Sequence, residues 1–174
     1  MPDVGSPEAV SRSVSNSNSP DYLIMKILLS LLFVALLVPA VSRAQSSEDG
    51  AAVRRAVLNY VEGFYEGDST KIALGVYPDV NKRGFYIPGS STTGEYVMEP
   101  MSYQEMFAYT RSVRESGRFA SDSAPKEVVV FEVLDQTASA RLTAYWGVDY
   151  LLLAKTDGEW KIWQVLWQTP PPAR

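Results

Sequence analysis

The side chains of this 174-residue sequence offer a narrow range of chemistry, because the chain contains no histidine and no cysteine. That composition excludes Ser-His-Asp and Cys-His nucleophiles as well as disulfide bonds. A zinc or iron site would have carboxylate ligands only, which suit those metals poorly, so we predict no metal site. No glycine-rich phosphate-binding loop precedes a helix, and we predict no cofactor. Carboxylates, tyrosines and tryptophans around a pocket remain as candidates.

Asp149 is the candidate catalytic residue, because it belongs to an otherwise apolar stretch. In an apolar pocket the pKa of its carboxyl would rise, and the group could shuttle a proton. A structural alternative is that 146–149 form a tight connection in which Asp149 caps backbone amides. Asp149 also alternates with Lys155, which we expect to face outward, so we favour the structural role.

Five further residues are candidates for binding a small apolar or aromatic ligand. Aromatic rings at helical spacing more often belong to the core, and that alternative stays open for each of them. Gln164 is expected to share a face with Trp160 and Ile162, where a buried amide needs either a ligand or a tyrosine as its partner. The candidates are Tyr60, Phe64, Tyr77, Trp146 and Gln164. Lys82 and Arg83 are interpreted as part of a solvated face.

The end of the chain, 147–168, predicts a β-hairpin. Asp157 and Gly158 supply the positive φ angles that a two-residue hairpin turn needs. Strand-like runs at 126–134 and 138–146 precede the hairpin, so the sequence predicts a four-stranded antiparallel meander.

Three helices are predicted ahead of that meander. Apolar residues recur at helical spacing over 46–66, and Asp68 is placed as the N-cap of a short helix over 69–76. Ser102 and Glu105 form a capping box that opens a third helix, ending near 115. Helices followed by a sheet indicate an α+β fold with the helices on one face.

Strict alternation along 160–167 makes both faces of the last strand apolar. One face is expected to meet the helices, and the other is too apolar for solvent alone. We therefore predict a homodimer that pairs sheet against sheet. The predicted interface residues are Tyr145, Trp163, Val165 and Trp167.

The N-terminal region predicts export. Lys26, the apolar run 27–38 and the Ser42-Arg43-Ala44 tripeptide form a signal peptide over 25–44, with cleavage before Gln45. The chain would then be periplasmic or extracellular, without a stable membrane anchor. Residues 1–24 are interpreted as a disordered extension or a misassigned start, and 45–174 as one domain. The net charge of −4 argues against nucleic acid as a partner.

Several segments together resemble the putative lumazine-binding family of the nuclear-transport-factor-two-like superfamily. The segments are YVEGFYEGD at 60–68, PDVNKR at 78–83, ASAR at 138–141, DYLLLAK at 149–155, DGEWKI at 157–162 and VLW at 165–167. The resemblance implies a cone-shaped α+β barrel, with three N-terminal helices packed on a curved antiparallel sheet, and a small-molecule pocket. Where such families often carry a histidine, this chain has Tyr77.

These observations leave three functions open, since a fold alone does not establish one. The leading hypothesis is an exported small-molecule-binding protein with its pocket between sheet and helices. The second is a cofactor-free isomerase, dehydratase or cyclase that uses Asp149 or a tyrosine for proton transfer. The third is a protein-interaction module with a filled barrel.

Overall fold

The computed structural model describes residues 48–170 continuously and three isolated positions before them, 20, 24 and 26. The predicted extension 1–24 and signal peptide 25–44 lie outside the continuous segment and stay predictions. Within the described residues, none of the helices combines the length and apolarity needed to cross a membrane.

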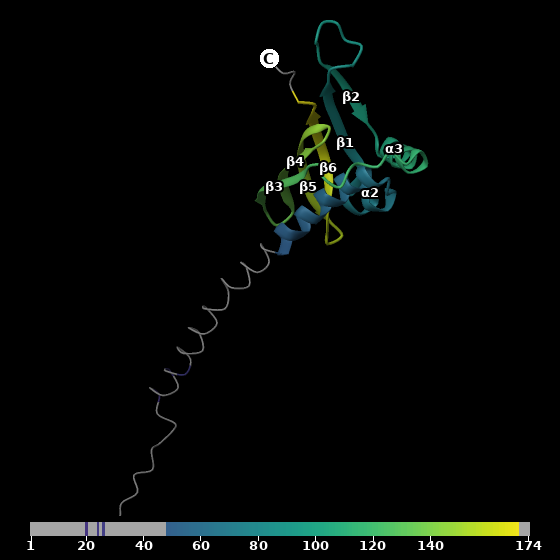
Figure 1. Cartoon of the computed structure of the whole chain (residues 1–174). Helices are drawn as coiled ribbons and strands as arrows, with labels where there is room; N and C mark the ends of the chain where they lie inside the picture. The colour runs from purple at the N-terminus through teal and green to yellow at the C-terminus, as the bar shows by residue number, and fades with distance from the viewer. Residues whose placement is uncertain (1–19, 21–23, 25, 27–47, 171–174) are drawn as a thin grey trace, which may run out of the picture. The chain divides into compact units, whose positions relative to one another are not determined.

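The segment 48–170 folds into three helices and six strands (Figure 1). Residues 48–66 form the first helix, which α2 (Ser69–Gly75) and later α3 (Tyr103–Ser116) follow. The strands are β1 (Val76–Tyr86), β2 (Val97–Met101), β3 (Lys126–Val133), β4 (Thr137–Ala144), β5 (Gly147–Thr156) and β6 (Glu159–Gln168). The predicted caps are confirmed: Asp68 accepts a hydrogen bond from the Thr70 amide, and Ser102 and Glu105 form the capping box.

The sheet is mixed and open, with the strand order β2-β1-β6-β5-β4-β3. β1 pairs with β6 in parallel, and the other neighbours are antiparallel. The predicted α+β class is confirmed, whereas the antiparallel sheet closed into a barrel is wrong. The predicted four-stranded meander corresponds to β3–β6 and leaves out β1 and β2. β1 carries Pro78 and three charged residues and so lacks the apolar alternation that marks a strand. Pro78 lies where the register between β1 and β6 shifts, a position that tolerates its missing N–H.

The β5–β6 hairpin has the predicted two-residue turn. Thr156 pairs with Glu159, and the two residues between them, Asp157 and Gly158, have φ angles of 52° and 82°. Positive φ at both turn positions matches the right-handed twist of the strands that the turn joins.

A β-bulge in β6 changes which face of the sheet the later side chains of the strand occupy, compared with strict alternation. Leu152 pairs with Gln164 but Leu153 pairs with Ile162, so Trp163 is an extra residue. As a result both Trp163 and Gln164 lie on the outer face of the sheet, and after them the alternation resumes with Val165 and Trp167 facing inward and Leu166 outward. Val165 is 1% exposed and belongs to the core, which corrects its assignment to a dimer interface.

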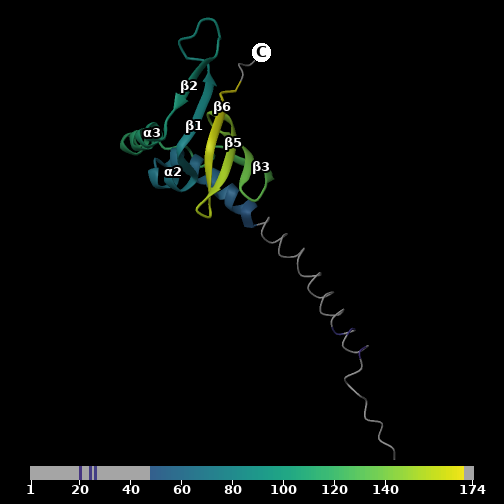
Figure 2. The ribbon, with the colours of Figure 1, turned by 180° about the vertical axis from the view of Figure 1, so that it is seen from behind.

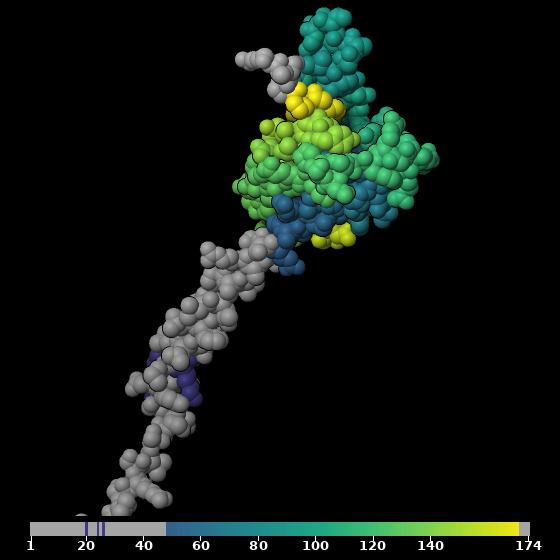
Figure 3. Space-filling model, in the orientation of Figure 1, coloured from purple at the N-terminus to yellow at the C-terminus, as the bar shows by residue number. Residues whose placement is uncertain are grey.

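The core lies between the inner face of the sheet and the helices. In the view from behind, β5 and β6 lie in front of the helices, so the helices cover the opposite face of the sheet (Figure 2). The first helix contributes the fully buried Val53, Val57, Tyr60 and Val61. The segment between α3 and β3 crosses this helix near its end, where the Ala120 amide donates to the Tyr65 carbonyl (Figure 3).

Candidate ligand site

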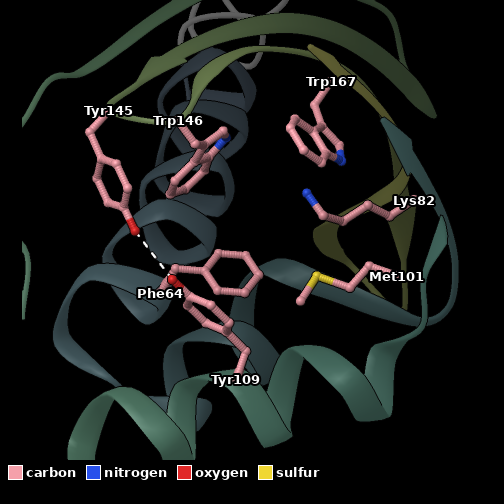
Figure 4. A pocket seen from close by; sticks show the side chains of 7 residues that line it. All are labelled: Phe64, Lys82, Met101, Tyr109, Tyr145, Trp146 and Trp167. Atoms are coloured by element: carbon pink, nitrogen blue, oxygen red, sulfur yellow. Dashed lines mark hydrogen bonds between the residues drawn. The ribbon is translucent and has the colours of Figure 1, made fainter. Parts of the chain in front are cut away.

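A cavity of about 220 Å³ lies between the helices and the inner face of the sheet (Figure 4). The first helix, β1, β2, α3 and β6 each supply one residue of its wall, and the turn between β4 and β5 supplies two. The lining residues are Phe64, Lys82, Met101, Tyr109, Tyr145, Trp146 and Trp167. Five of these seven are aromatic, and Lys82 is the one that carries a charge.

Lys82 is 7% exposed, although it belongs to a strand rich in polar residues. Alternation along β1 turns Lys82 inward with Val80 and Gly84, while Arg83 stays exposed. The interpretation of Lys82 as a solvated residue is therefore wrong. Its Nζ lies 5.2, 5.8 and 5.3 Å from the ring centroids of Tyr60, Phe64 and Trp167. Three aromatic rings thus hold the ammonium by cation–π attraction at the wall of the cavity.

A chain of hydrogen bonds leads from Lys82 into the core. Lys82 Nζ donates to Tyr60 Oη across 2.6 Å, and Tyr60 Oη donates to Asp149 Oδ2 across 2.8 Å. Trp146 Nε1 donates to the other carboxylate oxygen, Oδ1, across 2.7 Å. Asp149 is fully buried, so these two side chains replace the water that would otherwise solvate its charge.

Burial dominates the pKa of each member of this chain. It raises the pKa of the Asp149 carboxyl, and the Lys82 charge and the bonds from Trp146 and Tyr60 offset part of that rise. It lowers the pKa of the Lys82 ammonium to about 8, which the charge of Asp149 opposes. Burial, followed by the charge of Asp149, raises the pKa of the Tyr60 hydroxyl well above its ordinary value. The pKa of the Lys82 ammonium therefore lies well below that of an ordinary lysine.

Asp149 faces inward, contrary to the expectation based on its alternation with Lys155. Lys155 is itself only half-exposed and forms an ion pair of 2.6 Å with Asp49. The expected capping of backbone amides by Asp149 is also wrong, because its partners are the side chains of Tyr60 and Trp146. Asp149 does not line the cavity, so any effect on a ligand would pass through its neighbours.

Phe64 and Trp146 lie at the cavity as the ligand hypothesis expected, and Tyr60 lies directly behind them. Their rings meet edge to face, with centroids 5.1 to 6.3 Å apart. Edge-to-face contacts hold rings in fixed orientations, so this wall is preorganised. Whether these rings bind a ligand stays a prediction.

Tyr145 and Trp167, both predicted for an outer interface, instead line the cavity. Tyr145 stacks on Tyr65, and its hydroxyl lies 3.2 Å from that of Tyr109, the contact drawn in Figure 4. Trp167 turns inward after the bulge and lies against Gly84, where an added Cβ would stand 1.9 Å from the indole. Glycine at position 84 is therefore what gives Trp167 its place beside Lys82.

Tyr77 and Gln164 lie away from the cavity. Tyr77 stacks on Trp163 with ring centroids 4.1 Å apart, and Gln164 is exposed beside Leu152 on the outer face. The structure therefore corrects their expected position at the ligand pocket. The cause is the irregular pairing of β1 with β6, together with the bulge at Trp163.

Three cavity residues were missed by sequence reasoning: Lys82, Met101 and Tyr109. Met101 ends the short β2 strand, and Tyr109 lies on α3. The sequence did contain one signal for the burial of Lys82, because Lys82 alternates with Val80 and Gly84 in β1. Its charge nevertheless favoured the interpretation as a solvated residue. Among the described residues no group of three acidic side chains is placed to hold a metal ion.

Comparison with known proteins identifies one family whose model matches most of the chain. Residues 48–168 match the model of a family described as putative lumazine-binding. No curated protein matches the chain.

Solved structures share the architecture at low sequence identity. An NTF2-like protein of unknown function from Shewanella baltica is 18% identical, with a TM-score of 0.54 over 72% of this chain and 97% of its own. A similar protein from Silicibacter pomeroyi is also 18% identical, with a TM-score of 0.53 over 71% and 98% of the two chains. An NTF2-like protein with a cystatin-like fold from Novosphingobium aromaticivorans is 14% identical, with a TM-score of 0.54 over 79% and 92%. At these identities the likeness shows the fold alone.

Proposed function

This chain belongs to the putative lumazine-binding family, and from that premise we propose that it is an exported binding protein for a small, flat, uncharged molecule with a hydrogen-bond acceptor. The observation that carries the proposal is a cavity walled by aromatic rings around one buried amine. Its volume is below the range of about 300–1,000 Å³ that is usual for ligand pockets, which favours a ligand of one or two rings.

Charge balance favours an uncharged ligand. The ammonium of Lys82 is already offset by the Asp149 carboxylate through Tyr60. An anionic ligand would add a second negative charge to a buried site with a single cation, at a substantial desolvation cost. A neutral ligand with a carbonyl oxygen or ring nitrogen would accept a bond from Lys82 without that cost.

A titration with lumazine tests the proposal, because Trp146 and Trp167 line the cavity and their fluorescence should change when a ring stacks beside them. Lys82→Met keeps most of the side-chain volume and removes the donor. Losing a hydrogen bond from a charged group costs about 1.5–3 kcal/mol, so binding should weaken by about 10- to 150-fold. Arg83→Met is the matched control, since Arg83 is the exposed neighbour and should leave affinity unchanged. Equal affinity of the Lys82→Met variant would refute the assignment of the cavity.

The export part of the proposal rests on the apolar run 27–38 after Lys26 and on the Ser42-Arg43-Ala44 tripeptide. Sequencing the secreted protein from its N-terminus should give Gln45 as the first residue. A mature chain that still contains 28–38 would contradict cleavage.

A cofactor-free enzyme is the second candidate, and the buried Tyr60–Asp149 pair is the observation that favours it. Because Tyr60 and Asp149 both lie behind the wall, a ligand proton would first meet Lys82, which is hydrogen-bonded to Tyr60. Incubating a bound carbonyl compound in deuterated water distinguishes the two functions: an enzyme exchanges the α-protons of the ligand at a rate that falls in Asp149→Asn, and a binding protein does not.

We also propose that the chain forms a homodimer through the outer face of the sheet. Large apolar side chains gather there on β3, β5 and β6, each 41–57% exposed: Phe131, Tyr150, Leu152, Trp163 and Leu166. Cross-strand pairing puts Tyr150 opposite Leu166 and Leu152 opposite Gln164, so the side chains form one surface. A continuous apolar surface of this kind is uncommon on a monomer. Of the predicted interface residues, Trp163 is the one on this face.

A further inference from the structure

We propose that Lys82 is a nucleophile that condenses with an aldehyde or ketone group of the ligand to form an imine. The inference rests on the proposed function, since it assigns a chemical class of ligand to the same cavity. Three observations carry it: the position of the amine, its few partners, and the hydrogen-bonded chain behind it.

The Lys82 amine points into the cavity from β1 (Figure 4). It donates a hydrogen bond to Tyr60, and among the described residues no carboxylate lies within ion-pair distance of Nζ. The remaining directions around the nitrogen face aromatic rings and the cavity. A lysine desolvated in an apolar pocket is the arrangement that activates an amine toward carbonyl compounds.

The amine form is accessible near neutral pH. Burial lowers the pKa of Lys82 to about 8, so about a tenth of the molecules carry the free amine at pH 7. An ordinary exposed lysine, with a pKa of about 10.4, is protonated in nearly every molecule at that pH. Lys82 should therefore react before the other lysines of the chain.

The condensation balances without an added reagent. The nitrogen lone pair attacks the carbonyl carbon, and one proton moves from the nitrogen to the carbonyl oxygen to give a neutral carbinolamine. The nitrogen then loses a proton, and the hydroxyl leaves as water while the C=N bond forms. Tyr60 can accept the proton from nitrogen and pass its own to Asp149 along the hydrogen bonds that the structure shows, and the same path returns a proton to the departing hydroxyl.

Asp149 has a positioning role in this reaction, because it acts through Tyr60 and through its charge. Its negative charge raises the pKa of Lys82 against the effect of burial. Removing that charge should make the amine available at lower pH.

Reductive trapping tests the inference. The full chain is incubated at pH 7 with benzaldehyde and sodium cyanoborohydride, and peptide mapping measures the benzylation of each lysine over time. Lys82 should be modified on the order of ten-fold faster than Lys71, Lys126 or Lys161, which belong to the surface. The measurement needs no variant, so it does not depend on the folding of Lys82→Met.

The pH profile supplies the second readout. In Asp149→Asn, the midpoint of the rate against pH should move to lower pH, a shift that a purely structural role would not produce. An unmoved midpoint would overturn the role of Asp149. If Lys82 reacts no faster than the surface lysines while lumazine still binds, the imine is overturned and the proposed function stands. If lumazine also fails to bind, both are overturned.

Discussion

The hydroxyl of Tyr60 donates to Asp149 Oδ2 across 2.8 Å, joining the first helix to β5 over 89 residues of sequence. Both residues are fully buried, and Lys82 donates to the same hydroxyl from β1. One phenol group thus ties a helix to two strands at the inner wall of the cavity. The stability of the fold and the chemistry of the site depend on the same three side chains.

Tyr60→Phe should destabilise the protein while leaving the ring in place. The change removes a donor from Asp149 and an acceptor from Lys82, and an unsatisfied buried group costs about 1–3 kcal/mol. Urea unfolding followed by circular dichroism measures the loss. Tyr150→Phe is the control, because Tyr150 lies exposed on the outer face and should change stability little. Equal effects of the two substitutions would contradict the buried hydrogen-bonded chain.

Stability should increase with pH above 8 because of Lys82. Its pKa falls from 10.5 to about 8 on folding, so between those values the unfolded state binds more protons than the folded state. The free energy of unfolding must therefore rise with pH in this window, and the penalty of the buried charge is fully present below it. Chemical denaturation at pH 7.5, 8.5 and 9.5 should show the rise in the wild type and its absence in Lys82→Met. If the free energy of unfolding depended on pH in the same way for both proteins, Lys82 would have to be exposed to solvent.

Trp160→Ala should cost about 3–5 kcal/mol, as large-to-small core substitutions do. Trp160 is 4% exposed, and its Nε1 donates to Asp49 Oδ1 across 2.9 Å. Trp163→Ala provides the contrast in the same strand, because Trp163 is 41% exposed and should cost much less. A loss of less than about 1 kcal/mol for Trp160→Ala in urea unfolding would mean that its inner position is misassigned.

The difference between Trp160 and Trp163 shows what local patterns in the sequence can predict. The hairpin turn at Asp157-Gly158 and the cap at Ser102 were predictable because each depends on a few adjacent residues. The bulge at Trp163 was not, since it depends on the pairing of β6 with β5 and with β1. One extra residue in β6 moved Val165 and Trp167 from the predicted outer face to the inner one.

The site was predictable only in part for the same reason. Phe64 and Trp146 were found because large rings in an apolar context suggest a pocket wall. Lys82 was missed because a charged residue in a polar segment is usually solvated, and its burial depends on partners far away in the sequence, Tyr60 and Asp149. No local pattern reveals such a partner.

Trp163→Lys should convert the proposed homodimer into a folded monomer. Trp163 lies on the outer face and stacks on Tyr77, so a lysine there would introduce a charge into the interface without entering the core. Sedimentation equilibrium at tens of micromolar measures the mass, and Phe119→Lys, at another exposed aromatic residue, should leave the wild-type dimer intact. A wild-type protein that sediments as a monomer would rule out the assembly. Unfolding of Trp163→Lys would instead indicate that Trp163 supports the core.

Native mass spectrometry of the protein purified from its producing cells tests the central claim, that the cavity around Lys82 holds a small molecule. The spectrum should show one bound molecule per chain, kept by Arg83→Met and lost from Lys82→Met. It reports the bound mass directly, whether the ligand is held by hydrogen bonds or as an imine, and it reports the oligomer in the same experiment. A wild-type protein that carries no small molecule as purified, and gains none when lumazine or benzaldehyde is added in excess, would contradict the account.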